Sequence, residues 1–352
     1  MNYDKNSFLA GISVGRTLKG WAAGSEGFSG GSGSCNFPNG TEWTQSNITS
    51  SNFSSVHNAN GIWVACGYSR GLYYSTDGKI WEPSNITSGW FFGACNANGI
   101  WNAIGRAGIY YSYDGKTWSQ SNITKGPISS GGINHANGVW IALSDNDNPF
   151  YSSDGINWEK IAQRVRFNSI YYANGMWVGC GTNYYGKLYY SLNGKEWIET
   201  REKTFSNCVY NANGIWVVGT QSNGLLFSTD GMTWENNNIT NAPINSVYCA
   251  NGIWVACVAN SGGLYYSADG KNWEPSNITS VSFYAVYNAN GIWVVGSSNG
   301  GGVYYSIDGK TWAQSNITAI TSYSVCNANG IWVLCSASST GIYYSVSWEL
   351  NE

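Results

Sequence analysis

Two tryptophan positions recur along the chain at a nearly constant interval. One series follows Asn-Gly pairs, with spacings of 37–39 residues, at Trp63, Trp101, Trp140, Trp177, Trp216, Trp254, Trp293 and Trp332. The other has spacings of 37–40 residues, at Trp43, Trp81, Trp118, Trp158, Trp197, Trp234, Trp273 and Trp312. Such a repeat predicts an array of equivalent supersecondary units. A period of about 39 residues is close to the length that a four-stranded propeller blade requires.

The pattern inside one unit predicts four strands, named A to D in chain order. In the unit at 283–315, the alternation of apolar and polar residues places them at 283–288, 292–296, 303–306 and 311–315. Asn290-Gly291 separates A from B, and Asp308-Gly309 separates C from D. Both dipeptides favour tight turns between antiparallel strands. The unit therefore reads as one antiparallel blade.

The two ends of the repeat array complement each other. Residues 39–43 form a strand D with no strand A, B or C before it, whereas the last unit, 323–345, has A, B and C but no D. We expect the N-terminal strand to complete the C-terminal blade, which removes free sheet edges. The prediction is an all-β chain with a single eight-bladed β-propeller at 35–347. An N-terminal segment with a Gly/Ser-rich linker (1–34) precedes it, and a short tail (348–352) follows.

Composition excludes several partners. Charged residues make up 11% of the chain and the net charge is −3, which argues against a surface that binds nucleic acid phosphates. No apolar run of about 18 residues is present, so no membrane insertion is expected. The first residues lack the basic and apolar regions of a secretory signal. We therefore expect synthesis in the cytoplasm.

Six blades carry the pattern Ser-x-Asp-Gly-x-x-Trp between strands C and D. Its aspartates are Asp77, Asp114, Asp154, Asp230, Asp269 and Asp308. Aspartate can accept hydrogen bonds from backbone N–H groups of its own turn, and glycine permits positive φ. The pattern resembles the Asp-box, or BNR, repeat of sialidase-like β-propellers, with one residue fewer between Asp and Gly and with Asn193 replacing Asp in one blade. The resemblance implies a structural turn, away from any catalytic pocket.

A catalytic set is not evident in the sequence. Sialidases need an arginine cluster, a tyrosine activated by glutamate and an acidic proton donor, but this chain has six arginines and lacks the Phe/Tyr-Arg-Ile-Pro segment typical of that family. His57 and His135 are the only histidines, and no C-x-x-C motif occurs among the nine cysteines. We expect no catalytic residues, metal or cofactor. A sialidase-like glycoside hydrolase with a divergent site remains an alternative.

Several other residue types recur at one position of the repeat. Four cysteines follow the strand-B tryptophan by three residues, at Cys66, Cys180, Cys257 and Cys335, and are expected to be small buried residues. Asn-Ile-Thr recurs after strand D, at Asn47, Asn85, Asn122, Asn238, Asn277 and Asn316. We interpret these asparagines as parts of D–A loops rather than as glycosylation sites. Together the loops would present a ring of similar polar contacts on the ligand side of the propeller.

The repeats diverge most between residues 145 and 203, which hold 14 of the 37 charged residues. Aromatic side chains lie there beside charged groups in the predicted B–C and D–A loops, a combination suited to recognising saccharides or polar surfaces. The candidate ligand-binding residues are Asp145, Asp147, Arg164, Arg166, Tyr184, Tyr185 and Arg201. Drift in redundant blades is the competing interpretation.

Residues 6–21, ahead of the Gly/Ser-rich linker, form the other asymmetric feature. They resemble the N-terminal stretch of tail or minor structural proteins in phages and prophages of Gram-positive bacteria. The resemblance implies contact with other virion proteins through this segment and display on a virion after synthesis in the cytoplasm. A short disordered or packing extension is the alternative.

These observations favour a non-catalytic binding propeller of a phage tail or a prophage-encoded surface protein. Its expected partner is a glycan or protein of the host surface. Besides the divergent hydrolase, the alternative is an intracellular scaffold that uses the ring for protein–protein contacts.

Overall fold

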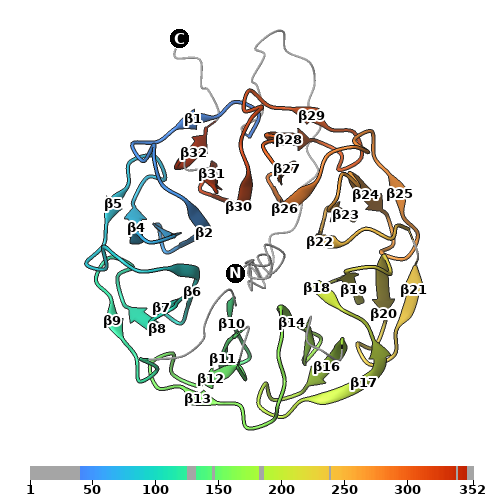
Figure 1. Ribbon diagram of the computed structural model, residues 1–352, viewed down its shortest axis with the longest axis horizontal. Helices are drawn as coiled ribbons and strands as arrows, with labels where there is room; N and C mark the ends of the chain where they lie inside the picture. The colour runs from blue at the N-terminus through green and yellow to red at the C-terminus, as the bar shows by residue number, and fades with distance from the viewer. Residues whose placement is uncertain are drawn as a thin grey trace, which may run out of the picture.

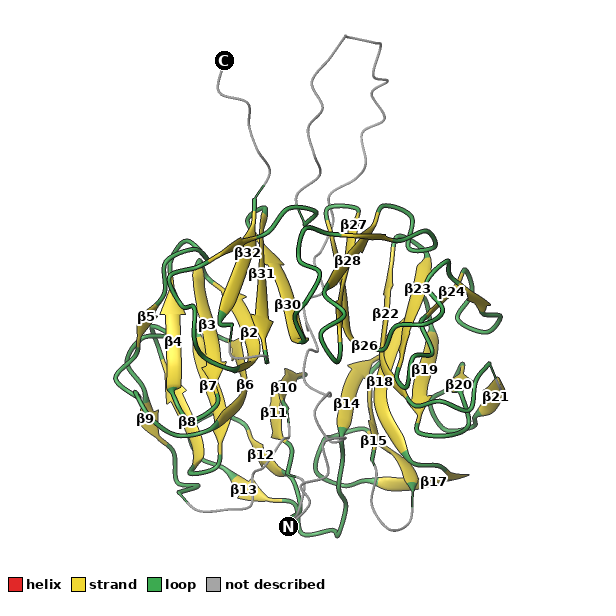
Figure 2. Cartoon of the chain, turned by 45° about the horizontal axis from the view of Figure 1, so that its top comes forward, coloured by secondary structure: helices red, strands yellow, loops and turns green. Residues whose placement is uncertain are grey.

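The computed structural model describes residues 40–124, 132–144, 147–181, 186–237, 239–337 and 340–346. Within these ranges the chain forms eight four-stranded antiparallel sheets and no helix. The sheets stand around one axis as the blades of a ring (Figure 1). The tilted view shows that the inner strands run roughly along this axis (Figure 2). The predicted all-β, eight-bladed propeller is therefore confirmed.

Each blade has four strands in the order A to D from the centre of the ring outward. The A strands are β2 (Phe53–Ala59), β6 (Phe91–Ala97), β10 (Ile133–Ala136), β14 (Ser169–Ala173), β18 (Ser206–Ala212), β22 (Ile244–Ala250), β26 (Phe283–Ala289) and β30 (Ser322–Ala328). The B strands are β3 (Ile62–Gly67), β7 (Ile100–Gly105), β11 (Val139–Ala142), β15 (Met176–Cys180), β19 (Ile215–Thr220), β23 (Ile253–Val258), β27 (Ile292–Ser297) and β31 (Ile331–Ser336).

The outer two strands are shorter than the inner two in every blade except blade 4, where strand D is the longest. The C strands are β4 (Gly71–Ser75), β8 (Gly108–Ser112), β12 (Phe150–Ser152), β16 (Lys187–Ser191), β20 (Leu225–Ser228), β24 (Leu264–Ser267), β28 (Val303–Ser306) and β32 (Ile342–Ser345). The D strands are β1 (Thr44–Gln45), β5 (Glu82–Pro83), β9 (Ser119–Gln120), β13 (Glu159–Lys160), β17 (Ile198–Lys203), β21 (Glu235–Asn237), β25 (Glu274–Pro275) and β29 (Ala313–Gln314). Blades 1 to 8 are numbered from β2, so that β1 belongs to blade 8.

The two ends of the array close the ring as the sequence predicts, although the closing strand is β1 (Thr44–Gln45) and not the predicted 39–43. Strand β1 pairs with β32, with Thr44 opposite Tyr344 and Gln45 opposite Tyr343. The backbone N–H of Gly40 also donates a hydrogen bond to Ser345 Oγ, 2.8 Å away. Blade 8 is thus assembled from both ends of the described chain (Figure 1), so that unfolding one end opens the ring.

The two turns of a blade have different chemistry. Asn290 and Gly291 both have positive φ, 51° and 82°, and all eight Asn-Gly pairs share this conformation, which is that of a two-residue hairpin turn. In the Asp308 turn only Gly309 has positive φ. Asp308 Oδ1 accepts hydrogen bonds from the backbone N–H groups of Lys310 and Thr311, each at 2.8 Å. The turn is therefore longer than expected, and β29 keeps two residues instead of the predicted 311–315.

A serine completes each Asp turn. Ser306 Oγ accepts a hydrogen bond from the backbone N–H of Gly309 and donates one to Asp308 Oδ1. All six aspartates predicted for this role make the equivalent bonds. In blade 4, Asn193 Oδ1 accepts from Lys195 and Glu196 at 2.9 Å each. The turn needs an acceptor at this position, but an amide oxygen can supply it.

The hydrophobic core lies between the blades. Each of eight buried clusters joins two neighbouring sheets; one of them packs Val255 and Leu264 of blade 6 against Phe283, Trp293 and Trp312 of blade 7. All eight strand-B tryptophans are at most 1% exposed, and the strand-D tryptophans cap the clusters, with only Trp273 half-buried. The four predicted core cysteines are fully buried.

The Asp turns make stability depend on pH. Burial alone would raise the pKa of Asp154, but hydrogen bonds from the Asn157 side chain and from the backbone N–H groups of Asn157 and Ile156 lower it to about 2. The ordinary aspartate pKa is about 3.9. Because the pKa is lower in the folded ring, the carboxylate stabilises it fully above about pH 4, and this contribution is lost as the pH falls toward about 2.

We therefore predict that Asp154→Asn flattens the fall in stability on acidification while the variant still folds at neutral pH, as Asn193 does naturally. Asp154→Ala, which removes the acceptor, is expected to lose about 1–2 kcal/mol at neutral pH, and this difference from the unmodified protein is expected to shrink as the pH falls toward about 2. Urea unfolding across the acidic range measures both effects. An acid dependence of Asp154→Asn that matches the unmodified protein would show that the turn carboxylate does not carry it.

Candidate functional site

The B–C and D–A loops share one face of the ring, opposite the Asn-Gly and Asp turns. The segment before each strand A hydrogen-bonds to the B–C turn of the same blade. In blades 1 and 2, Tyr68 N donates to Asn52 O and Arg106 N donates to Trp90 O, each at 3.0 Å. These bonds fix the loops to each other, so the face presents a defined arrangement of side chains. We call it the loop face.

The repeated Asn-Ile-Thr asparagines of this face link neighbouring blades. Asn85 Nδ2 donates to the backbone oxygen of Trp118 at 2.9 Å, and Trp118 N donates to Asn85 Oδ1 at 2.8 Å. The same two-bond clamp joins Asn47 to Trp81, Asn122 to Trp158, Asn277 to Trp312 and Asn316 to Trp43. In blade 3, where the motif is missing, Gln163 clamps Trp197 in its place.

This clamp corrects the expected role of the D–A loops. The loops were predicted to form a ring of similar polar contacts on the ligand side, but five of the six motif asparagines use both the oxygen and the nitrogen of the amide to bind the next blade, and Asn238 lies outside the described residues. The flanking residues are also structural. Ser84 Oγ accepts from Ile86 N, and Ile86 O accepts from Leu72 N. The motif asparagines therefore hold neighbouring blades together, and the residues of the loop face that are not repeated are the other candidates for recognition.

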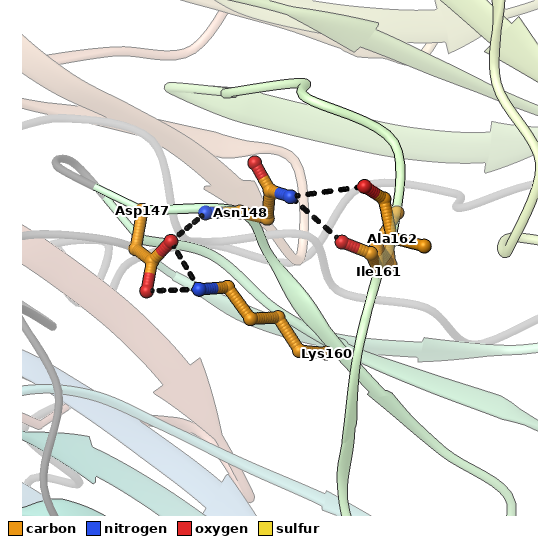
Figure 3. A network of polar contacts seen from close by, with 5 residues as sticks. All are labelled: Asp147, Asn148, Lys160, Ile161 and Ala162. Atoms are coloured by element: carbon orange, nitrogen blue, oxygen red, sulfur yellow. Dashed lines mark hydrogen bonds and ion pairs between the residues drawn. The ribbon is translucent and has the colours of Figure 1, made fainter.

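One non-repeated group is the predicted charged sector of blades 3 and 4. Lys160 Nζ lies 2.5 and 2.6 Å from the two carboxylate oxygens of Asp147, and Asn148 N donates to Asp147 Oδ1 at 2.8 Å (Figure 3). Asn148 Nδ2 reaches the backbone oxygen atoms of Ile161 and Ala162. The network joins the B–C loop of blade 3 to its D–A segment.

Charges around Asp147 favour its ionised form. Burial alone would raise the pKa of this carboxyl, but the hydrogen bonds from Lys160 and Asn148 and the positive charges of Lys160 and Arg166 lower it overall. Arg166 is half-buried, whereas Arg164 is exposed. The structure thus brings Asp147 and Arg166 together, with Lys160 as an ion-pair partner that the sequence did not indicate.

The other predicted residues are dispersed or lie elsewhere. Arg201 is exposed on β17, the outer strand of blade 4, where Lys187 Nζ and Glu199 Oε2 form an ion pair of 2.5 Å. Asp145, Tyr184 and Tyr185 lie outside the described residues, as does the N-terminal segment 6–21.

A second non-repeated group was missed by the sequence interpretation. The Arg106 guanidinium carbon lies 4.0 Å from the ring centroid of Trp90, and the Tyr68 ring meets Trp90 edge-on at 5.6 Å. Arg70 forms a backbone bridge with Gly89, directly before Trp90. We call Tyr68, Arg70, Trp90 and Arg106 the aromatic–arginine patch. One signal could have revealed it, since Trp90 belongs to neither tryptophan series.

The acidic and nucleophilic side chains of the blades have structural roles. Glu82, Glu159 and Glu274 each accept a hydrogen bond from a tyrosine hydroxyl of the adjacent strand C. Burial raises the pKa of the Cys66 thiol to about 12, which makes it a poor nucleophile. These three carboxylates and the Cys66 thiol therefore belong to the frame of the ring.

The two histidines also pack as blade residues. His57 meets Trp101 edge-on at 5.6 Å, and His135 lies against Trp140 at 4.8 Å. Among the described residues, no three His, Cys, Asp or Glu side chains are placed to hold a metal ion. The same residues include no helix of the length and apolarity that a membrane span needs.

No family model and no curated protein matches the chain. Solved β-propellers resemble it in structure. The computationally designed Ika8 protein aligns with a TM-score of 0.68 at 9% identity, over 85% of this chain and 98% of that one. BamB from Moraxella catarrhalis gives 0.61 at 9%, over 88% and 99%. YCF48 bound to D1 peptide gives 0.57 at 15%, over 88% and 97%. These likenesses establish the fold class, a β-propeller.

The clamp between blades predicts a measurable loss of stability. Asn85→Ala removes both bonds to Trp118, and we expect a loss of about 1–3 kcal/mol because part-buried backbone groups lose their partners. Thr87→Ala, two residues away and exposed, is the matched control and is expected to change stability by less than about 0.5 kcal/mol. Urea unfolding monitored by tryptophan fluorescence measures both. Equal effects of the two substitutions would contradict the clamp.

Proposed function

We propose that this chain is a non-catalytic binding propeller that recognises its partner with the loop face. The observation that carries the proposal is the difference in role between repeated and non-repeated residues. Repeated aspartates and asparagines form the hydrogen bonds of the turns and clamps, while non-repeated aromatic and charged side chains lie on the loop face. A rigid frame that carries variable loops is suited to binding a partner, because the loops supply the specific contacts.

The partner that we propose is a surface component of a host, a protein or a glycan. One structural neighbour, YCF48, is bound to D1 peptide, which supports a protein partner for a ring of this shape. We further propose, from the resemblance of residues 6–21, that the chain is a phage-tail or prophage-encoded surface protein. That segment would contact other virion proteins, and the ring would be displayed after synthesis in the cytoplasm.

Two alternatives predict different behaviour. A sialidase-like hydrolase with a divergent site would turn over aryl glycosides, and the turnover would vanish when an acid on the loop face is replaced. An intracellular scaffold would co-purify with soluble partners and be absent from virus particles. Fractionation of the native source and a panel of aryl glycosides therefore separate all three functions.

Blocking one face tests the proposal directly. In a Cys35→Ser background, Ser222→Cys places a thiol on the loop face of blade 5, and Thr229→Cys places one in the opposite turn of the same blade; both side chains are exposed. We expect a polyethylene glycol chain on Ser222→Cys to abolish retention on host cells or on a glycan array, and the same label on Thr229→Cys to leave it intact.

The described native cysteines are wholly or largely shielded, so labelling is selective. Retention lost only through the Thr229→Cys label would place recognition on the turn face and contradict the proposal. So would the absence of retention on any cell or array for the unlabelled protein.

The charged sector gives a second prediction. Arg164→Ser with Arg166→Ser is expected to change ligand preference while shifting the free energy of unfolding by about 1 kcal/mol or less, because surface charge pairs contribute little to stability. Thermal unfolding and retention of the double variant measure both effects. Unfolding of the variant, or unchanged retention of an identified ligand, would remove this sector from the recognition surface.

A further inference from the structure

We propose that the aromatic–arginine patch is an anchor site for an acidic segment of a protein partner. The inference deepens the proposed function and rests on it, since it names the part of the loop face and the chemistry of the partner. It concerns blades 1 and 2, on a different part of the ring from the charged sector of blades 3 and 4.

The patch is held together by backbone bonds from two blades. Gly89 pairs with Arg70 of the B–C turn in blade 1, and its oxygen accepts a hydrogen bond from Gly71 N at 3.1 Å. The next residue, Trp90, accepts from Arg106 N of the B–C turn in blade 2 at 3.0 Å. Residues 89–90 therefore lie between the two arginine-bearing turns, and the arrangement exists before any partner arrives.

Trp90 is an apolar side chain that the frame does not require. Its position in the repeat is defined by the carbonyl that accepts from the B–C turn; blade 5 places Phe205 there, whereas four other blades place Asn52, Pro243, Ser282 and Thr321 there. A large aromatic side chain is therefore not needed for the fold. Trp90 nevertheless stays 39% exposed between Tyr68 and Arg106, so a partner that covers its ring gains apolar burial.

The two guanidinium groups set the charge of the partner. Both arginines are exposed, and in the part of the chain that the structure describes neither forms an ion pair; the two ion pairs there belong to Lys160 and Lys187. Stacking on Trp90 holds the Arg106 plane in place and leaves its N–H donors to bind a carboxylate. A partner covering the patch must supply negative charge, because burying unpaired guanidinium groups is costly.

The residue types favour a protein partner. Tryptophan, tyrosine and arginine are the residues that dominate binding energy at protein interfaces, usually in a compact central cluster. Here the three types meet in one place, with Phe92 buried behind Tyr68 as a rigid support. A segment with carboxylates next to an aromatic or aliphatic side chain complements both the arginines and the aromatic side chains of the patch.

Fluorescence polarisation with fluorescein-labelled peptides of about twelve residues tests the inference. The first peptide alternates Glu and Asp with Phe; the others replace its acids by Gln and Asn, replace its Phe by Ala, or carry an amidated C-terminus. A labelled oligogalacturonate provides the same charge on a glycan. We expect the acidic aromatic peptide to bind and the peptide with Gln and Asn in place of its acids to fail. Binding of the acidic peptide is expected to weaken as the salt concentration is raised.

Protein variants locate the site. Arg70→Gln with Arg106→Gln, and separately Trp90→Ala, are expected to weaken binding of the acidic aromatic peptide about tenfold or more. Lys79→Gln, on the opposite face of blade 1, is the matched cation control and is expected to bind like the unmodified protein. Thermal unfolding shows whether each variant is folded. The double arginine variant tests the site without removing an aromatic side chain.

The outcomes separate this inference from the proposed function. Equal loss in Lys79→Gln, no binding of any acidic peptide, or binding of the oligogalacturonate alone overturns the acidic-peptide assignment. The Ser222→Cys label identifies a target that the loop face binds. If the patch variants are still fully retained on that target, the patch is not the binding site, although the loop-face function stands. Binding that survives C-terminal amidation supports recognition of side-chain carboxylates, whereas binding lost on amidation overturns the acidic-segment assignment, because the chain terminus is then what the patch binds.

Discussion

The ring depends on the packing of tryptophans between neighbouring sheets. No blade has a core of its own, because its buried residues face the sheets on either side. Each blade is stable only next to two others, and this condition is met everywhere only when the ring is closed. Pairing of β1 with β32 is therefore more than a detail of topology, since it gives blade 8 its outer strand.

Directional bonds supplement this packing at the outer edge of the ring. The asparagine clamps tie the D–A segment of one blade to the strand-D tryptophan of the next, so the residue that fills the cluster is also held through its backbone. A planar amide suits the task because it donates and accepts at once, as a backbone peptide does. Glutamine performs it in blade 3, where the chain takes a different path.

The repeat could be predicted from the sequence because its signals are local. Asn290-Gly291 specifies a hairpin turn by its own φ preferences, and the Trp spacing gives the number of blades without knowledge of any contact. The short β29 was not predicted, because Asp308 diverts two N–H groups from the strand pairing. The clamps were also missed, since Asn85 and its partner Trp118 lie 33 residues apart in different blades.

The candidate site was the hardest part to predict, for the same reason. Arg70, Trp90 and Arg106 lie on three segments that the packing of blade 1 beside blade 2 brings together. Divergence among the repeats identified the densest run of charges instead, where Lys160 already neutralises Asp147. In a chain with so few charged residues, the informative feature is a pair of arginines that forms no ion pair among the described residues and flanks an exposed aromatic side chain. By that criterion the two arginines beside Trp90 mark the surface where a second molecule completes the electrostatic balance.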